Sequence, residues 1–212
     1  FAPGVTQLFP EGHIINVHPW EHNEVAPSLS AALNTEVPIV AIHLTRPPIK
    51  IPDRKALEMA HHFESSKGAY IIKDFDENKK KEGVVIVRGT SSTNSIVQIL
   101  PALKENGPNV KIIAAISWEL YRRQDKKYRE LIIAPDQWKD TMVITNGALR
   151  LMNNWISNPM VKKYSMSPDF DNRWRTGGSL DQIIEESQLD TGSILSCIKK
   201  FAKERALRLN NI

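Results

Sequence analysis

Arg46 is the residue of this sequence best suited to binding an anion. It follows the apolar, β-branched segment VPIVAIHLT (37–45), and two prolines follow it. Such a segment predicts a buried strand, and open α/β sheets bind ligands in the crevice at the carboxyl ends of their strands. A guanidinium group there suits a phosphate, because its fixed donors match the phosphate oxygens. The alternative is a surface arginine that pairs with Asp53 or Glu58.

Two loops offer weaker candidates for anion or base binding. RGTSST (88–93) precedes a predicted helix, whose free N–H groups could hold an anion together with Arg88. A capped helix start is the favoured interpretation, because any helix needs such a cap. DFDNRWRTGGS (169–179) places Trp174 between two arginines and could clasp a phosphate or stack on a nucleobase. Tryptophan and arginine are also the residues that interfaces favour, so we expect a subunit or domain contact there.

The sequence predicts no metal site and no catalytic residue. His18 and His22 have i,i+4 spacing, but Pro19 lies between them and no third ligand has a fitting position. His61 and His62 are adjacent and would point apart on a helix. Local motifs contain no Ser-His-Asp or Cys-His arrangement.

The candidate residues lie on alternating strands and helices. Residues 13–19 predict a strand, 21–34 a helix and 37–45 a second strand, which together form one right-handed βαβ unit of a parallel sheet. A lone unit cannot bury both faces of its sheet. We therefore expect residues 1–46 to be the end of a larger domain, and the proline-rich and then polar residues 47–66 to be a linker.

Residues 67–212 predict a self-sufficient α/β domain with an open, mostly parallel twisted sheet between helices. AYIIKDF (69–75) and GVVIVRGT (83–90) are predicted to pair as a hairpin across the charged turn ENKKKE. The other predicted strands are residues 109–117, 141–147 and, weakly, 160–166. The first predicted helix covers residues 91–107, with a serine or threonine cap and a kink or break at Pro101. Further helices are predicted at residues 125–133 and from residue 148. Two final helices are predicted to be capped by Ser179 and by Asp190 or Thr191.

Composition argues against several classes of protein. The chain has 212 residues, 41% of them hydrophobic, and its 28 basic and 24 acidic residues give a net charge of +4 without a dense basic stripe. A nucleic-acid partner is therefore not expected. The sequence has one cysteine, Cys197, and shows no signal peptide and no apolar run near the length of a membrane span. This combination is typical of a cytoplasmic protein. Because the chain begins at Phe1, we expect a fragment.

Several segments, in order, resemble the transketolase family of thiamine-diphosphate enzymes. Through Pro19, Glu21 and Glu24, HPWEHNEV resembles the start of a helix in the family's pyrimidine-binding domain, and IHLTR (42–46) resembles the strand that follows. The segments that resemble the family's C-terminal domain are YIIKD, VVIVRGTSST, AISWELYRRQDKKYRELII, TMVITNG and the closing helices. The resemblance covers nearly the whole chain and implies that domain, preceded by the end of the pyrimidine-binding domain.

The resemblance implies substrate-binding roles for two residues. The family's arginine that matches Arg46 contacts the substrate phosphate. PGVTQLF (3–9) lies where transketolases have the loop D-G-P-T-H, and Gln7 stands in place of its histidine. Glutamine can hydrogen-bond a sugar hydroxyl but cannot carry a proton at neutral pH. Near TMVITNG, Thr145 replaces an acidic residue that is usual in the family.

The resemblance also implies an activity, cofactors and partners. The whole enzyme would be a homodimeric transferase that moves a two-carbon ketol unit between sugar phosphates, using thiamine diphosphate and a divalent cation, magnesium. This chain has no G-D-G motif and begins after the glutamate that activates the thiamine. Alone, it is expected to bind no cofactor, to be inactive, and to supply dimer contacts and architecture.

Two alternatives stay open. The sister families, deoxyxylulose-phosphate synthase and the 2-oxo-acid dehydrogenase components, share this C-terminal domain. A non-catalytic regulatory module that binds an anion or a nucleotide is the other alternative, and its support lies in RGTSST and the loop around Trp174.

Overall fold

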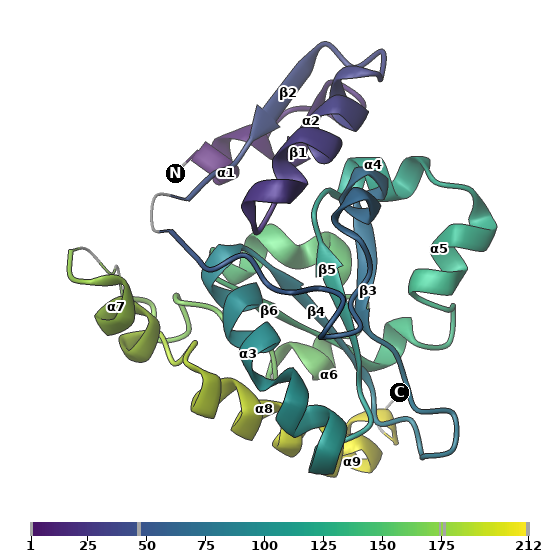
Figure 1. Cartoon of the computed structure of the whole chain (residues 1–212), viewed down its shortest axis with the longest axis vertical. Coiled ribbons are helices and arrows are strands. Elements are labelled where there is room, and N and C mark those ends of the chain that lie inside the picture. Colours follow the sequence, from purple (N-terminus) through teal and green to yellow (C-terminus); the bar gives the residue numbers. More distant parts are fainter. Residues whose placement is uncertain (1, 46–47, 174, 176, 211–212) are drawn as a thin grey trace.

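The computed structural model describes residues 2–45, 48–173, 175 and 177–210. The N-terminal part contains helix α1 (Ala2–Thr6) and a two-stranded parallel sheet of β1 (Ile14–Val17) and β2 (Ile39–Ile42). Helix α2 (Val25–Leu33) connects the two strands (Figure 1). The predicted βαβ unit is therefore present.

A second sheet of four strands forms the centre of the remaining chain. Its spatial order is β3–β5–β4–β6, with bounds β3 (Ala69–Lys73), β4 (Val84–Arg88), β5 (Lys111–Ala115) and β6 (Thr141–Thr145). Strand β4 pairs in parallel with β5 and β6, and β3 runs antiparallel to β5. All residues of β4, β5 and β6 are buried, as expected for a sheet that is covered on both faces. The open, mostly parallel sheet is confirmed.

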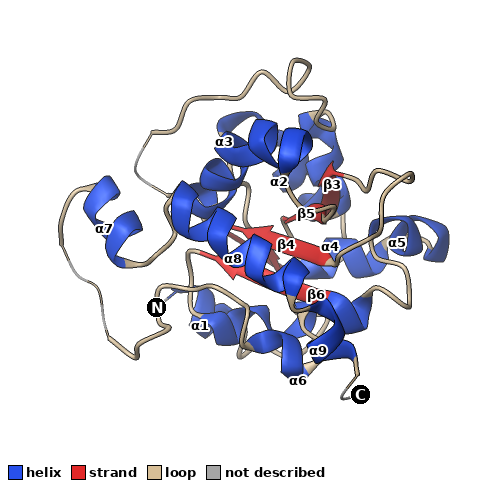
Figure 2. Ribbon diagram, turned by 90° about the horizontal axis from the view of Figure 1, so that it is seen from below, coloured by secondary structure: helices blue, strands red, loops and turns tan. Residues whose placement is uncertain are grey.

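Helices cover both faces of this sheet (Figure 2). The helices over one face are α3 (Thr90–Asn106) and α8 (Thr191–Lys203); those over the other are α4 (Trp118–Arg123), α5 (Lys126–Ile132) and the 3₁₀ helix Leu149–Trp155. Side chains of β4 alternate between the two layers: Val85 and Val87 pack with the first, and Val84 and Ile86 with the second.

The described residues also form the short α-helices α6 (Pro159–Lys162), α7 (Leu180–Glu186) and α9 (Arg205–Leu209) and the 3₁₀ helices His22–Glu24, His62–Lys67 and Trp138–Asp140. The predicted caps of α7 and α8 are confirmed, since Ser179 accepts a hydrogen bond from the backbone of Gln182 and Asp190 accepts one from the backbone of Ser193.

The predicted hairpin of residues 69–75 and 83–90 is wrong. Strand β5 lies between β3 and β4 and pairs with both. A strand with two buried faces needs hydrogen-bonding neighbours on both edges, and β4 obtains them from β5 and β6. The charged segment is a loop instead, held by Asn109, whose amide donates to the carbonyls of Asp76 and Lys79.

One helix prediction and one strand prediction also need correction. Helix α3 begins earlier than expected, with Gly89 as its N-cap and no side-chain cap, and it continues through an exposed Pro101. The weak strand at 160–166 is replaced by α6, because Asn158 caps a helix that starts at Pro159. In that segment Met166 forms an isolated parallel bridge to Ile144, and the Ser165 hydroxyl accepts a hydrogen bond from the backbone of Val143 in β6.

The N-terminal unit and the four-stranded sheet share one hydrophobic core. Ile15 and Val17 of β1 belong to the same cluster of buried residues as the strands β3 to β6 and helix α3. The backbone of His18 donates to the carbonyl of Ile116 at 2.7 Å. The boundaries at residues 46 and 66 stay a prediction.

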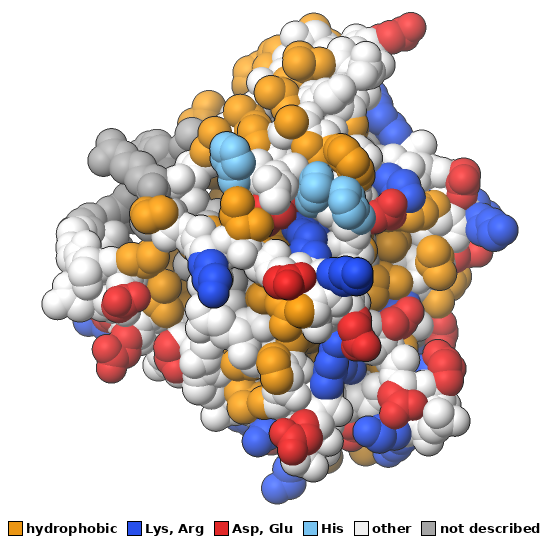
Figure 3. All heavy atoms as spheres, in the orientation of Figure 1, with side chains coloured by type: hydrophobic (Ala, Val, Ile, Leu, Met, Phe, Trp, Pro, Cys, Tyr) orange, Lys and Arg blue, Asp and Glu red, His pale blue; other side chains and the backbone are white. Residues whose placement is uncertain are grey.

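The surface carries charges of both signs. On the face drawn in Figure 3, acidic and basic side chains are interspersed with apolar ones. Within the described residues, no helix is both long enough and apolar enough to span a bilayer.

Candidate functional site

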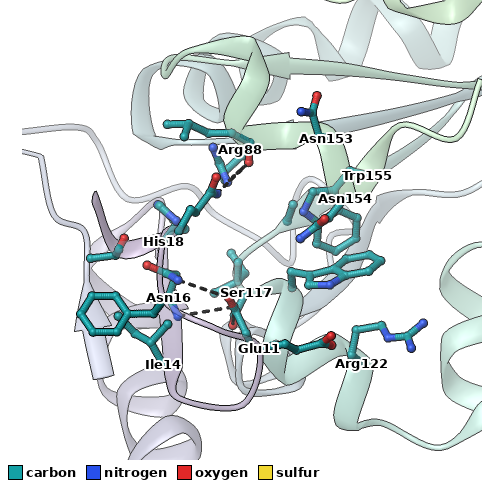
Figure 4. A pocket seen from close by; sticks show the side chains of 18 of the residues that line it. Glu11, Ile14, Asn16, His18, Arg88, Ser117, Arg122, Asn153, Asn154 and Trp155 are labelled. Carbon is teal, nitrogen blue, oxygen red and sulfur yellow. Dashed lines mark hydrogen bonds between the residues drawn. The ribbon is translucent and has the colours of Figure 1, made fainter. Parts of the chain in front are cut away.

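A cavity of about 440 Å³ lies between the N-terminal unit and the carboxyl ends of β4 and β5 (Figure 4). Its wall comes from segments that are distant in sequence: residues 6–12, β1 with His18, Arg88 at the end of β4, residues 115–119, 122 and 123 around the start of α4, and residues 150–155. Ligands of open α/β sheets bind at this end of the strands, so the cavity is the candidate site.

Arg88 is the innermost charge of the cavity wall. It is the last residue of β4 and only 7% exposed. Its Nη1 donates to the carbonyl of Leu151 at 3.1 Å, and no carboxylate among the described residues forms an ion pair with it. Burial lowers the pKa of Arg88 to about 10, against the opposing effect of Glu119. The guanidinium therefore stays charged at neutral pH.

The nearest acidic side chain on the wall, Glu119, is already hydrogen-bonded. Its Oε1 accepts from the Asn16 amide at 3.2 Å, and its Oε2 accepts from the Ser117 hydroxyl at 3.2 Å and from the backbone of Asn16 at 3.4 Å. These bonds join β1 to the start of α4. They position one wall of the cavity and reduce the capacity of Glu119 to neutralise Arg88.

A stacked pair of histidines adjoins the cavity. The rings of His18 and His43 lie 4.3 Å apart at an interplanar angle of 11°, and a ring nitrogen of His43 lies 3.1 Å from the Asn16 amide oxygen. Burial, Arg88 and His43 hold the pKa of His18 well below its ordinary value of 6.5. Burial and Arg88 lower the pKa of His43 as well. Both rings are therefore neutral at pH 7.

This arrangement predicts that His18 lowers the stability of the chain at acidic pH. The pKa of His18 is lower in the folded state than its ordinary value of 6.5, so as the pH falls below 6.5 the unfolded chain gains a proton that the folded chain does not. The contribution of His18 to the free energy of unfolding should then decrease as the pH decreases, by at most about 1.4 kcal/mol per pH unit for one proton. Urea unfolding between about pH 7 and about pH 5 measures this slope.

His18→Phe supplies the comparison, because it keeps an aromatic ring without the titrating group. The difference in stability between wild type and this variant should shrink as the pH falls. Glu24, whose pKa burial raises to about 7, acts in the opposite direction but is present in both proteins. Equal pH slopes in the two proteins would contradict the assignment.

Of the two substrate-binding residues predicted from the sequence, one can be placed at this cavity. Gln7 lines the cavity, is exposed, and donates from Nε2 to the Leu151 carbonyl at 3.0 Å, the same carbonyl that Arg88 contacts. Arg46 lies outside the described residues. A role in substrate binding stays a prediction for both.

The other candidates can be placed in part. Trp174 lies outside the described residues, while its neighbours Arg173 and Arg175 both pair with Asp171. The described part of the chain contains no group of three His, Cys, Asp or Glu side chains that could hold a metal ion.

Sequence reasoning missed most of the cavity wall. The arginines at its mouth are exposed and lie on two separate segments: Arg122 and Arg123 on α4, and Arg150 in the 3₁₀ helix. The basic pair in ELYRRQD was a visible signal, but nothing in the sequence shows that α4 faces β1.

Comparisons with known proteins agree with the fold. Residues 68–166 match the family model described as Transketolase-like TK C-terminal domain. Transketolase 7 of Craterostigma plantagineum is 29% identical over 123 residues, which are 57% of this chain and 17% of that protein. The solved structure of transketolase from Leishmania mexicana matches 95% of this chain and 27% of its own, with a TM-score of 0.67 at 14% identity.

A Pichia stipitis transketolase mutant, solved in complex with xylulose 5-phosphate, matches 94% of this chain and 26% of its own, with a TM-score of 0.66 at 16% identity. The chain thus spans less than a third of the length of each of these proteins. The matched family model and the shared fold agree with the resemblance drawn from the sequence: residues 68–166 match the transketolase-like C-terminal domain, and the fold of the chain is that of transketolase structures.

Proposed function

We propose that this chain is the C-terminal part of a thiamine-diphosphate enzyme that transfers a two-carbon ketol unit between sugar phosphates. The observation that carries the proposal is the transketolase-like C-terminal domain at residues 68–166, together with a likeness in fold that extends over 95% of the chain. The N-terminal βαβ unit is part of that likeness. Its strand β2 keeps all four residues partly or fully exposed, as expected of a sheet that continues into further strands.

The proposed division of labour follows from this arrangement. Residues 1–46 would complete a pyrimidine-binding domain, 47–66 would be the linker, and 67–212 would give architecture and contacts within a homodimer. A cytoplasmic location belongs to the same proposal. The relatives from Solanum tuberosum and Spinacia oleracea, in contrast, are named as chloroplastic transketolases.

Thiamine diphosphate and its magnesium ion would be held by the remainder of the enzyme. The described residues bring together no cluster of His, Cys, Asp or Glu that fits a metal ion, so no step of the reaction is assigned to side chains of this chain. Its contribution to the chemistry would be substrate binding.

Two residues would contact the substrate. In the sequence Arg46 follows Thr45, shortly after β2 ends at Ile42. A guanidinium at the carboxyl end of a parallel strand suits a sugar phosphate. Gln7 would hydrogen-bond a sugar hydroxyl from the cavity wall, where its amide nitrogen is used by the Leu151 carbonyl and its amide oxygen has no protein partner among the described residues.

The test uses the full-length enzyme. Arg46→Ala is expected to raise KM for a phosphorylated sugar about tenfold or more, because a charge-assisted bidentate contact is lost. Gln7→Ala should raise KM less, since a neutral hydrogen bond is weaker. Steady-state kinetics with a phosphorylated and a non-phosphorylated sugar provide the control, because only the former should respond to Arg46→Ala.

An unchanged KM for the phosphorylated sugar would refute the role of Arg46. The activity itself is tested separately, by assaying the wild-type enzyme with sugar phosphates and with pyruvate or other 2-oxo acids. Turnover of 2-oxo acids alone would assign the chain to a sister enzyme instead.

A further inference from the structure

We propose that the cavity beside Arg88 binds a small phosphate-bearing metabolite, with its phosphate on the guanidinium of Arg88. The inference concerns the same cavity as the substrate contact proposed for Gln7, but it is tested by binding to this chain without turnover, so it can fail separately from the ketol-transfer function. It rests on a buried charge without a counter-ion, on the charge of the surrounding wall, and on the size and chemistry of the cavity.

The buried charge is the first observation. More than nine-tenths of Arg88 is buried, and the one hydrogen bond that its guanidinium makes to the described protein is to the Leu151 carbonyl. A guanidinium carries five N–H donors, and buried charges in proteins are normally paired. In the sheet, Arg88 is in register with Thr145, a neutral residue. Donors of Arg88 are therefore available to an anion that enters the cavity.

The wall favours negative ligands. Besides Arg88 it carries Arg122, Arg123 and Arg150, and none of the four pairs with a carboxylate among the described residues. Its acidic members are Glu11 and Glu119, and Glu119 is hydrogen-bonded to Asn16 and Ser117. An excess of positive charge that lines a concave, partly dry surface concentrates anions there.

A phosphate fits this set of donors better than a cation or a neutral group would. Its oxygens accept two parallel N–H bonds from a guanidinium fork. The arginines at the mouth, Arg123 and Arg150, are exposed and would attract the ligand before it reaches Arg88. Arg122 lies over the Trp118 ring, with its Cζ 5.6 Å from the ring centroid, which holds its charge at the rim.

The remaining wall indicates an organic body rather than a bare ion. A volume of about 440 Å³ lies in the range of small-molecule sites. The side-chain amides of Asn153 and Asn154 and the ring of Trp155 border the cavity (Figure 4), and Trp118 lines it as well. Amides can hydrogen-bond hydroxyl groups and ring nitrogens, and indole rings offer flat apolar surfaces. A sugar phosphate and a nucleoside monophosphate both meet these requirements.

The experiment measures binding of three probes to the 212-residue chain: inorganic phosphate, ribose 5-phosphate and adenosine 5′-monophosphate. Titration calorimetry and thermal unfolding are done at constant ionic strength, set with chloride. We expect the organic phosphates to raise the melting temperature and to bind more tightly than inorganic phosphate. The tighter of the two identifies the body of the ligand.

Variants assign the binding to Arg88. Arg88→Met should lower affinity for the organic phosphates about tenfold or more, and Arg88→Lys, which keeps the charge but loses the fork, should retain part of it. Arg173→Met is the matched control, since Arg173 is exposed, pairs with Asp171, and is absent from the cavity wall; it should bind as wild type does.

Stability without ligand provides a second readout. In phosphate-free buffer Arg88→Met should melt at a temperature no lower than wild type, because it removes a buried charge that lacks a partner. The proposal is overturned if none of the probes binds wild type at millimolar concentration, or if Arg88→Met and wild type bind equally. Should Arg88→Met fail to fold, the proposal is refuted by wild-type affinity in Arg88→Lys.

Discussion

Replacing Arg54 with methionine is expected to lower the free energy of unfolding by about 3–5 kcal/mol, as measured by urea denaturation. Arg54 comes from the segment between the two sheets, and its side chain is 10% exposed. Its Nη2 pairs with Glu21 at 2.9 Å and with Glu24 at 2.7 Å, and both carboxylate side chains are fully buried. Its Nη1 donates to the Ala60 carbonyl at 2.9 Å.

The expected loss is large because the variant leaves two buried carboxylates without their cation. Glu24 would keep hydrogen bonds from the Tyr70 hydroxyl at 2.5 Å and from the backbone of Trp20 at 3.1 Å. Burial already raises the pKa of Glu24 to about 7, so without the cation Glu24 would take up a proton, whereas Glu21 would lose its ion-pair partner. The guanidinium also lies over the rings of Trp20 and Tyr70, with its Cζ 5.5 and 5.4 Å from their centroids, so packing is lost as well.

A second substitution separates the charge effect from the packing effect. In the Arg54→Met background, Glu21→Gln should restore part of the stability, because it removes the buried carboxylate that lost its ion-pair partner. Lys104→Met is the matched control, since Lys104 pairs with Glu58 on the surface and such pairs contribute little. If Arg54→Met unfolded at the same urea concentration as Lys104→Met, the network would not stabilise the fold as inferred.

This network shows where sequence reasoning ends. Pro19, Glu21 and Glu24 indicated the start of a helix in the pyrimidine-binding domain, while residues 47–66 indicated only a polar linker. Arg54 lies 33 residues after Glu21 and 30 after Glu24. No local periodicity relates positions so far apart, so their meeting is decided by tertiary packing. Arg54 consequently fixes the linker to the N-terminal unit, through Glu24 before α2, and to the four-stranded sheet, through Tyr70 of β3.

The fold class was predictable because it depends on local patterns. β-branched runs such as 84–88 and 111–115 are strands in the structure, since apolar runs of that length fit a buried parallel sheet. Strand order was not predictable in the same way. Because β3 and β4 are consecutive in the sequence, they were predicted to pair as a hairpin, but β5 lies between them and β4 pairs with β5 and β6.

The candidate site was predictable only in its components. Arg88 was noted beside a helix start, and Gln7 was noted in a loop, 81 positions apart in the printed sequence. Both side chains donate to the Leu151 carbonyl, which belongs to a 3₁₀ helix. No sequence motif predicts the position of that helix. Whether Arg88 has a counter-ion is likewise a property of the packed structure, because any of several acidic side chains could have reached it.

Replacing Asp140 with alanine is expected to cost about 3–5 kcal/mol of stability, also through an unpaired buried charge. Asp140 precedes β6, and its carboxylate accepts from Nε of Arg208 at 2.7 Å and from Nε of Arg205 at 2.5 Å. Arg208 is fully buried. Its guanidinium packs against Phe201, with its Cζ 3.6 Å from the ring centroid.

The effect should be concentrated at the end of the chain. Arg208 also donates to the Glu82 carbonyl, just before β4, at 3.0 Å, so the pair with Asp140 fixes α9 against the edge of the sheet. Hydrogen exchange should show that Asp140→Ala exposes the amides of α9 more than those of β4, which has strand neighbours on both edges. Asp136→Ala, at an exposed position whose side chain has no hydrogen bond or ion pair within the described part of the chain, should leave both the urea midpoint and the exchange pattern unchanged. Equal protection of α9 in the two variants would mean that Arg208 is held by its carbonyl contacts and by Phe201, without Asp140.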